Sequence, residues 1–395
     1  MAAVLPARGL SASESVRPDS TLILSSLGLA MLGLVMVCST SISIAESHGV
    51  GPFYFLNRHA VFLLAGSIAA AVIWHIPLRT MERYSPLMAL AAFGLLLLVF
   101  VPGVGMRING ARRWVNLGVS SFQVVELVKL FVILYMAGYM VRHRESLQTS
   151  LGGILKPLGV VAILVGMLLL QPDFGGSVLL IGIVVGMLWL GGASAGRLLA
   201  IGAFALPLVV IVARLEAYRL KRMTIFLDPW ADPFNDGFQL TQALIAIGRG
   251  EWFGVGLGDS VQKLFYLPEA HTDFIVAVIA EELGFAGLVV LLGLFAMFVG
   301  RAFRLGLAAY DAGRVYAGSV AYGIGLWIAL QAGISIGVNL GVLPTKGLTL
   351  PFVSSGGSSV LMSCVAVGVL LRIAREIDYP DTKPKGPVAK RGERG

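Results

Sequence analysis

One aspartate, Asp273, stands at the start of a long apolar stretch, behind a loop that reads L-F-Y-L-P-E-A-H-T-D-F-I at 264–275. An ionisable side chain where water meets hydrocarbon is a candidate functional group by default. As a general base, Asp273 would accept a hydroxyl proton from a substrate held in an outer cavity. The alternative is a helix cap, in which Asp273 or Thr272 accepts hydrogen bonds from free backbone N–H groups.

Two further acids, Glu281 and Glu282, follow on the same apolar stretch. A helix rises ~12 Å between Asp273 and Glu281, whereas the paired carboxylates of glycosidases stand roughly 5–9.5 Å apart. We therefore expect Glu281 and Glu282 to make polar contacts between helices. A lone base still suits a phosphate-ester leaving group, which departs without a proton and needs only cations around it.

Other charged residues sit in or beside apolar stretches. Glu126 and Lys129 share a helix face at spacing i, i+3. They form either a structural ion pair or a site in which Lys129 binds an anionic head group. Asp173, in the turn Q-P-D-F-G-G, is expected to cap a helix. A set of basic residues on the same side suits a pyrophosphate, although interfacial snorkelling explains part of it: Arg58, Arg112, Arg113, Lys129, Arg219, Arg222, Lys263 and Lys346.

Several other chemistries are excluded. The segment 254–258, G-V-G-L-G, lacks the spacing of a dinucleotide-binding turn, and 232–237, D-P-F-N-D-G, lacks two ligands of a calcium loop. No His or Cys residues have metal-ligand spacing. The basic residues have no interleaved aromatics, so no nucleic-acid partner is expected.

The composition predicts an all-α polytopic membrane protein. Of 395 residues, 57% are hydrophobic and only 13% charged, with mean hydropathy +0.84, whereas soluble domains are about a quarter charged. About ten apolar runs are long enough to cross a ~30 Å hydrocarbon core with some tilt. They lie at 22–45, 59–77, 85–102, 122–141, 157–171, 175–192, 197–213, 274–300, 315–339 and 357–374. Cys38 and Cys364 lie inside such runs and are expected to be core residues.

Ten spans put both termini on one side of the membrane. Basic residues number about 18 in the segments on that side and about 11 on the other, which makes the termini cytoplasmic. The expected organisation is a cytoplasmic arm at 1–20, a membrane domain at 21–376 and a basic cytoplasmic tail at 377–395. The tail either meets anionic lipid or docks a partner. Arg107, Arg112 and Arg113 violate the charge rule and indicate an anionic ligand outside.

Two irregular segments face the outer side. The loop 214–272, between the seventh and eighth spans, is rich in aromatic residues, and loops of that length are usually functional. The segment 341–359 is apolar but is broken by Pro344, Pro351 and four glycines, so it cannot form one helix. Irregular backbone near a membrane lines a cavity or is buried in protein.

Three long motifs carry a family resemblance. They are R-R-W-V-N-L-G at 112–118 with F-Q-V-V-E-L-V-K at 122–129, the stretch 226–275, and G-V-L-P-T-K-G-L-T-L-P-F-V-S-S-G-G-S-S at 341–359. With its ten-span layout, the chain resembles the SEDS family of bacterial cell-wall proteins over nearly its whole length. S-V-Q-K-L-F-Y-L-P-E-A-H-T-D-F at 260–274 and P-T-K-G-L-T-L-P-F at 344–352 resemble the division branch rather than the elongation branch.

The resemblance implies an enzyme that polymerises lipid II into glycan strands at the outer face of the inner membrane, at the division septum. Asp273 falls on the catalytic acid of the H-T-D-F motif. Five more residues fall on positions that the family uses around its central cavity: Arg58, Glu126, Lys129, Asp173 and Gln242. The chain departs from the family pattern at Val124 and Val125, usually Pro and Ser, at Ser355, usually Tyr, and at His59, usually Gln.

The expected function is therefore a peptidoglycan glycosyltransferase with Asp273 as general base. Arg58, Arg113, Lys129 and Lys346 would stabilise the leaving pyrophosphate, alone or with a divalent cation, Mg²⁺ or Mn²⁺. The implied partners are a class b penicillin-binding transpeptidase (FtsI-like), other division proteins and membrane lipids. Two alternatives from other classes stay open. One is a lipid II flippase with no bond chemistry, and the other is a division scaffold.

Overall fold

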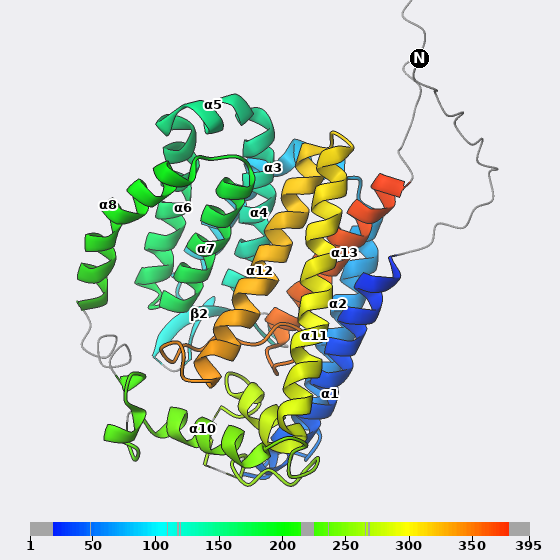
Figure 1. The fold of residues 1–395 in the computed structure, drawn as a ribbon, viewed down its shortest axis with the longest axis vertical. Helices are drawn as coiled ribbons and strands as arrows, with labels where there is room; N and C mark the ends of the chain where they lie inside the picture. The colour runs from blue at the N-terminus through cyan, green and yellow to red at the C-terminus, as the bar shows by residue number, and fades with distance from the viewer. Residues whose placement is uncertain are drawn as a thin grey trace, which may run out of the picture.

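The protein is a bundle of long helices with a small sheet and a short crossing helix at one end (Figure 1). The computed structural model describes residues 19–378 except 48, 109, 117, 119, 215–224, 236, 265 and 268. Most of the predicted N-terminal arm and basic tail therefore lies outside the described residues. Arg219 and Arg222 also lie outside them.

Ten helices coincide with the ten predicted apolar runs, which confirms the all-α membrane class. Eight of them are long and apolar enough to cross a membrane, and α7 and the 195–205 part of α8 are shorter apolar helices. The ten are α1 (Ser20–Ser47), α2 (Tyr54–Trp74), α3 (Leu78–Leu98), α4 (Val124–Arg142), α6 (Leu151–Leu170), α7 (Phe174–Leu190), α8 (Ala195–Arg214), α11 (Ile275–Asp311), α12 (Val315–Asn339) and α13 (Gly357–Asp378).

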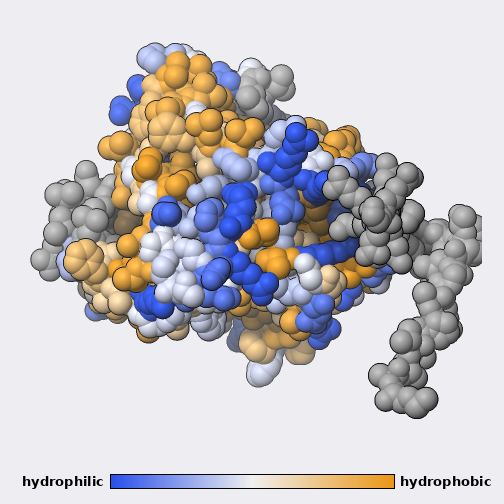
Figure 2. All heavy atoms as spheres, turned by 90° about the horizontal axis from the view of Figure 1, so that it is seen from above, coloured by the Kyte–Doolittle hydropathy of each residue, from blue (hydrophilic) through white to orange (hydrophobic). Residues whose placement is uncertain are grey.

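The bundle has central helices and peripheral ones. In α4 and α13, 78% and 83% of the most apolar window is buried, against 17% in α2 and 22% in α3. Large apolar side chains therefore stay exposed around the bundle, as lipid-facing side chains must be. Seen from the end where α5 (Arg144–Thr149) lies, polar residues gather in the middle and apolar ones at much of the rim (Figure 2). Both cysteines are free thiols; Cys364 is buried, as predicted, whereas Cys38 is only half-buried.

A three-stranded antiparallel sheet joins α3 to α4. Its strands are β1 (Gly105–Ile108), β2 (Ala111–Asn116) and β3 (Ser121–Gln123), with Met106 opposite Trp114 and Val115 opposite Phe122. This sheet was not predicted from the sequence. It turns the unexpected basic cluster at 107–113 into a rigid ribbon across the end of the bundle opposite α5 (Figure 1).

The long predicted loop contains the 3₁₀ turn η1 (Pro229–Ala231) and helix α10 (Phe238–Gly250). Helix α10 lies across the same end of the bundle as the sheet and packs against α11 (Figure 1). Residues 251–256, which follow α10, bond to the backbone of α11 at a point where that helix is broken.

Helix α11 is interrupted at Gly284, which adopts φ 65° and ψ −163°. The loop before α11 repairs the break. The N–H groups of Val255 and Gly256 donate to the carbonyls of Glu281 and Glu282, and those of Phe285 and Ala286 donate to the carbonyls of Glu251 and Trp252. These four bonds give partners to backbone groups on both sides of the break, as a buried kink requires.

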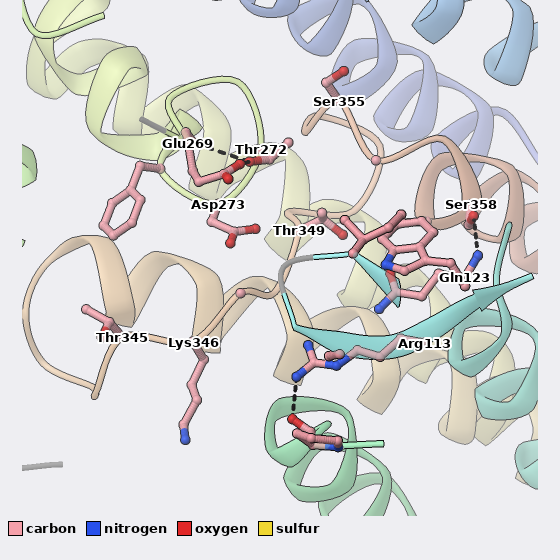
Figure 3. Close-up of a pocket in the computed structure, with 18 of the residues that line it drawn as sticks. Arg113, Gln123, Glu269, Thr272, Asp273, Thr345, Lys346, Thr349, Ser355 and Ser358 are labelled. Atoms are coloured by element: carbon pink, nitrogen blue, oxygen red, sulfur yellow. Dashed lines mark hydrogen bonds between the residues drawn. The ribbon is translucent and has the colours of Figure 1, made fainter. Parts of the chain in front are cut away.

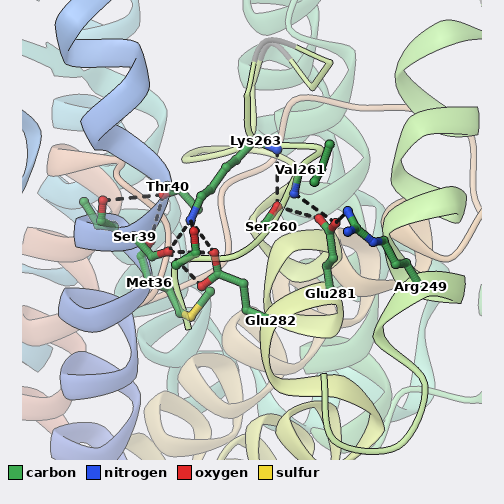
Figure 4. A network of polar contacts seen from close by, with 11 residues as sticks. Met36, Ser39, Thr40, Arg249, Ser260, Val261, Lys263, Glu281 and Glu282 are labelled. Carbon is green, nitrogen blue, oxygen red and sulfur yellow. Dashed lines mark hydrogen bonds and ion pairs between the residues drawn. The ribbon is translucent and has the colours of Figure 1, made fainter. Parts of the chain in front are cut away.

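The side chains of the two adjacent acids fix this junction (Figure 4). Glu281 is fully buried and accepts from Arg249, Ser260 and the N–H of Val261. Glu282 pairs with Lys263 at 2.6 Å and accepts from Ser39 of α1 at 2.7 Å. The prediction that both acids make polar contacts between helices is therefore confirmed.

The break predicts a sharp cost for a side chain at position 284. Gly284→Ala would hold a non-glycine residue at positive φ and place its Cβ 2.4 Å from the backbone nitrogen of Gly254. We expect a loss of about 2 kcal/mol or more, seen as a lower melting temperature in detergent. The matched control is Gly293→Ala on the same helix, where a Cβ meets no atom within 4 Å. Equal melting temperatures for the two variants would contradict this account of the kink.

Candidate active site

A cavity of about 690 Å³ opens at the end of the bundle that carries the sheet and α10 (Figure 3). Three segments distant in sequence supply most of its lining: the 108–123 ribbon, the turn 269–274 before α11, and the 345–359 part of the segment between α12 and α13. Pro172 and Gln239 complete it. Asp273 lies on its wall, as do Arg113 and Lys346. The second irregular segment is therefore a cavity lining, as predicted.

The turn that carries Asp273 is held through its main chain. The carbonyls of three consecutive residues each accept one hydrogen bond. Ser355 N–H donates to His271 (2.9 Å), Ser354 Oγ to Thr272 (2.6 Å) and Asn339 Nδ2 to Asp273 (2.9 Å). All three donors belong to the end of α12 or the segment after it. The backbone of the turn therefore cannot shift relative to that segment without breaking these bonds.

Asn339 also caps the N-terminal end of α11 with its side chain. Its Oδ1 accepts from the N–H of Ala277 in the first turn of α11 (3.0 Å), and its Nδ2 also donates to Ser335 (2.8 Å). The N-cap of α11 is Phe274, and no side chain of the cap position bonds to the helix. An amide from α12 therefore accepts from one of the free N–H groups at the start of α11.

The Asp273 carboxylate sits directly over the backbone of Gly347. A Cβ built on Gly347 would lie 2.9 Å from Asp273 Oδ2. The backbone of Gly347 has no positive φ, so glycine is required here by space and not by conformation. The carboxylate thus lies against the residue that follows Lys346 in sequence, and Lys346 lines the same cavity.

Two cations bring positive charge to the cavity. Lys346 Nζ lies 3.9 Å from the centroid of the Phe174 ring. Arg113, on β2, donates to the carbonyls of Gln171 and Pro172 and approaches Asp173 at 3.8 Å, so the turn between α6 and α7 holds its guanidinium. Asp173 is the N-cap of α7, accepting from the N–H of Gly176 at 3.0 Å, as predicted.

A second, much smaller cavity of about 20 Å³ adjoins the first and shares Gln123, Gly347 and Thr349 with it. Glu126, Lys129 and Asp173 line it. Lys129 is buried and pairs with Glu126 at 2.8 Å, so the predicted ion pair forms. This small cavity has room for about one water molecule.

Gln331 of α12 joins this ion pair to the cavity wall. Its Oε1 accepts from Lys129 Nζ (2.6 Å) and from Trp327 Nε1 (2.7 Å), while its Nε2 donates to the carbonyl of Thr349 (2.9 Å). Lys129 Nζ also lies 4.8 Å from the Trp327 ring centroid, within cation–π range. The buried charge is thereby solvated by protein groups.

Two predicted residues do not line either cavity. Arg58 is exposed on α2 and lies over the Phe62 ring at 6.0 Å. Gln242 is half-buried on α10, and Gln239, one turn earlier, lines the large cavity in its place. The structure therefore brings together Asp273, Arg113 and Lys346, and behind them Glu126, Lys129 and Asp173.

Sequence reasoning missed several polar residues of the site. Glu269 accepts from Thr272 Oγ1 (2.6 Å) beside Asp273. The N–H of Gln123 donates to Ser358 Oγ (2.8 Å), which ties the sheet to α13. Asn339 and Gln331 were also missed. The available signal was an amide inside an otherwise apolar helix, which needs a buried partner.

The described residues contain no group of three or more His, Cys, Asp and Glu side chains that could hold a metal ion. The acids behind the cavity are instead paired with cations or cap a helix. This donor set does not fit a resident divalent cation.

The fold and the site define an integral membrane protein with a charged cavity at one end of its helix bundle. The chain belongs to the FtsW/RodA/SpoVE family, whose model, described as "Cell cycle protein", matches residues 20–379.

Relatives and solved structures agree with this assignment. The "Probable peptidoglycan glycosyltransferase FtsW" of Xanthomonas oryzae is 52% identical over 95% of this chain and 78% of its own. That of Nitrosococcus halophilus is 50% identical over 92% of this chain and 94% of its own. A chain of a peptidoglycan synthase complex that coordinates polymerization and crosslinking has TM-score 0.75 and 31% identity, covering 92% of this chain and 99% of its own. Thermus thermophilus RodA, a rod shape determining protein, has TM-score 0.67 and 29% identity, covering 91% and 97%.

The buried ion pair predicts a stability pattern. Lys129→Met leaves the Glu126 carboxylate buried without its cation, which typically costs about 3–5 kcal/mol. Lys129→Met with Glu126→Leu removes both charges and should recover most of that loss. The check is the melting temperature of each purified variant in detergent. A double variant as unstable as the single one would show that the pair itself is not what stabilises this region.

Proposed function

We propose that this protein is a peptidoglycan glycosyltransferase that polymerises lipid II during septal wall synthesis, with Asp273 as general base. The observation that carries the proposal is the Asp273 carboxylate, fixed by its backbone in a 690 Å³ cavity with Arg113 and Lys346 on the same walls. The other carboxylate of the cavity, Glu269, accepts a hydrogen bond from Thr272 Oγ1. The names of relatives about half identical to the chain support the same reaction class.

In the proposed reaction, Asp273 removes the proton from the 4-hydroxyl of the acceptor sugar. The hydroxyl oxygen attacks the anomeric carbon of the donor from the face opposite its pyrophosphate. The bond between that carbon and the pyrophosphate oxygen breaks, and the electron pair leaves with the pyrophosphate. An α-linked donor thereby gives a β-1,4 linkage. One base suffices because the leaving group takes no proton.

Positive charge stabilises the departing pyrophosphate. Arg113 and Lys346 line the cavity itself, whereas Lys129 acts from behind the wall through the Gln331 contact to Thr349. We assign no such role to Arg58, which lines neither cavity. A Mg²⁺ or Mn²⁺ ion, if the reaction uses one, would arrive with the pyrophosphate.

The proposal places the cavity on the outer face of the cytoplasmic membrane, since more basic residues lie at the opposite ends of the spans. It also includes a class b penicillin-binding transpeptidase as partner. A solved neighbour belongs to a synthase complex that coordinates polymerization and crosslinking, which supports a partner of this kind. Adding such a transpeptidase should raise the polymerisation rate.

A lipid II flippase is the rival function, because charged residues in a membrane cavity also suit transport. The product separates the two. Purified protein in detergent, where there are no leaflets to cross, makes longer glycan strands only if it is an enzyme.

The base is tested by Asp273→Asn in purified protein with labelled lipid II. The amide is close to isosteric but cannot accept the proton, so we expect polymerisation to fall by about 10²-fold or more. The matched control is Asp259→Asn, an exposed acid of the preceding loop, which should keep the wild-type rate. Near wild-type polymerisation by Asp273→Asn would remove Asp273 from the mechanism.

The space over Gly347 gives a second test. Gly347→Ala pushes a methyl group against the Asp273 carboxylate, so polymerisation should drop at least tenfold while the melting temperature stays close to that of the wild type. Gly333→Ala on α12, where a Cβ meets no atom within 4 Å, is the control. If both variants polymerise equally well, the carboxylate does not occupy the position described.

A further inference from the structure

A hollow of about 460 Å³ lies apart from the catalytic cavity and shares no lining residue with it. Glu251, Trp252 and Phe285 line it. The two aromatic rings meet edge to face, with centroids 5.4 Å apart and planes at 82°. The side chains are 69% exposed at Trp252 and 52% at Phe285, so the pair forms an open wall and not a core contact.

The depth of this hollow along α11 follows from helix geometry. Arg304, exposed near the opposite end of the helix, lies nineteen residues after Phe285. At 1.5 Å per residue the two are about 28 Å apart, close to the ~30 Å thickness of a hydrocarbon core. The exposed side chains between them are apolar at Val289, Val290 and Leu292. Phe285 and Trp252 therefore sit at the water interface, where aromatic side chains are enriched.

The hollow also carries one negative charge. Within the described part of the chain, the Glu251 carboxylate makes no hydrogen bond or ion pair. Its backbone is nonetheless fixed, with φ 44° and its carbonyl accepting from the N–H of Phe285 (2.9 Å). A carboxylate beside two aromatic rings is the arrangement that attracts an organic cation, by charge and by cation–π contact.

From this geometry we propose that the hollow binds a phospholipid with a primary ammonium head group, phosphatidylethanolamine, from the leaflet that faces the cavity. The ammonium lies between Glu251 and the two rings, and the acyl chains run along the exposed apolar face of α11. Choline head groups lack N–H donors for the carboxylate, and phosphatidylglycerol carries net negative charge. The orientation, though not the chemistry, rests on the proposed function.

The bound lipid would touch the junction that completes the kinked helix. Glu251 and Trp252 are the two residues whose carbonyls accept from the N–H groups of Phe285 and Ala286 across the break at Gly284. A head group held by their side chains stabilises the loop in its docked position. The same loop continues to Lys263, which pairs with Glu282.

Lipid binding to the delipidated full chain tests the proposal. Native mass spectrometry would measure binding of phosphatidylethanolamine, phosphatidylcholine and phosphatidylglycerol with the same acyl chains. We expect phosphatidylethanolamine to bind best, and Glu251→Gln to weaken its binding about fivefold without changing phosphatidylglycerol binding. Glu145→Gln, an exposed acid at the other end of the bundle, is the control. Unchanged phosphatidylethanolamine binding by Glu251→Gln overturns the proposal.

A second measurement places the hollow in the bilayer. Wild type and Trp252→Phe are compared in nanodiscs with and without brominated acyl chains. The difference in fluorescence between the two proteins is the contribution of Trp252, and the bromine atoms should quench it. An unquenched Trp252 means that the surface is covered by protein, and it overturns the lipid proposal. Phe285→Leu, which keeps the helix but removes one ring, should weaken phosphatidylethanolamine binding if Glu251→Gln proves unstable.

Neither readout requires polymerisation, so the lipid proposal and the proposed function fail separately. Loss of polymerisation in Asp273→Asn leaves lipid binding unchanged. Loss of the lipid in Glu251→Gln leaves the Asp273 cavity intact, because the two sites share no residue.

Discussion

The site depends on three hydrogen bonds from one segment to the carbonyls of His271, Thr272 and Asp273. They make the turn before α11 and the segment after α12 into one unit. The cavity exists because this unit stands opposite the 108–123 ribbon. The Asn339 amide makes three of the bonds involved. It donates to the carbonyl of Asp273, accepts from the N–H of Ala277 in α11 and donates to the carbonyl of Ser335 in α12. A buried amide with all its bonds made fixes geometry more firmly than an exposed one.

Behind the cavity, a buried charge is stabilised in the same manner. Lys129 has an ion pair, an amide acceptor and an aromatic face around it, so its ammonium is not left unsolvated. Gln331 lies eight residues before Asn339, which is about 12 Å along α12. Helix α12 thus contacts the site twice. Gln331 bonds to Lys129 and Thr349, and Asn339 bonds to Asp273. A movement of α12 would change both positions together.

Much of this could be predicted from sequence. Uninterrupted apolar runs located the ten helices, and spacing paired Glu126 with Lys129. Other features left no such signal. Strands of three to six residues are too short to show alternation, so the sheet was missed. The rotation of a helix about its axis is set by its neighbours. The sequence therefore could not tell that Arg58 lines neither cavity or that Gln239, and not Gln242, lines the large one. The role of Asn339 needed tertiary contacts.

The anchoring of Asp273 through main-chain carbonyls has a consequence for turnover. A general base changes its charge twice in every cycle, once on gaining the proton and once on releasing it. Carbonyl oxygens do not titrate, so the three bonds that hold the turn have the same donors and acceptors in both states. The framework is therefore insensitive to the protonation that we propose for the side chain, so in the proposed reaction successive sugars would meet the carboxylate in one place.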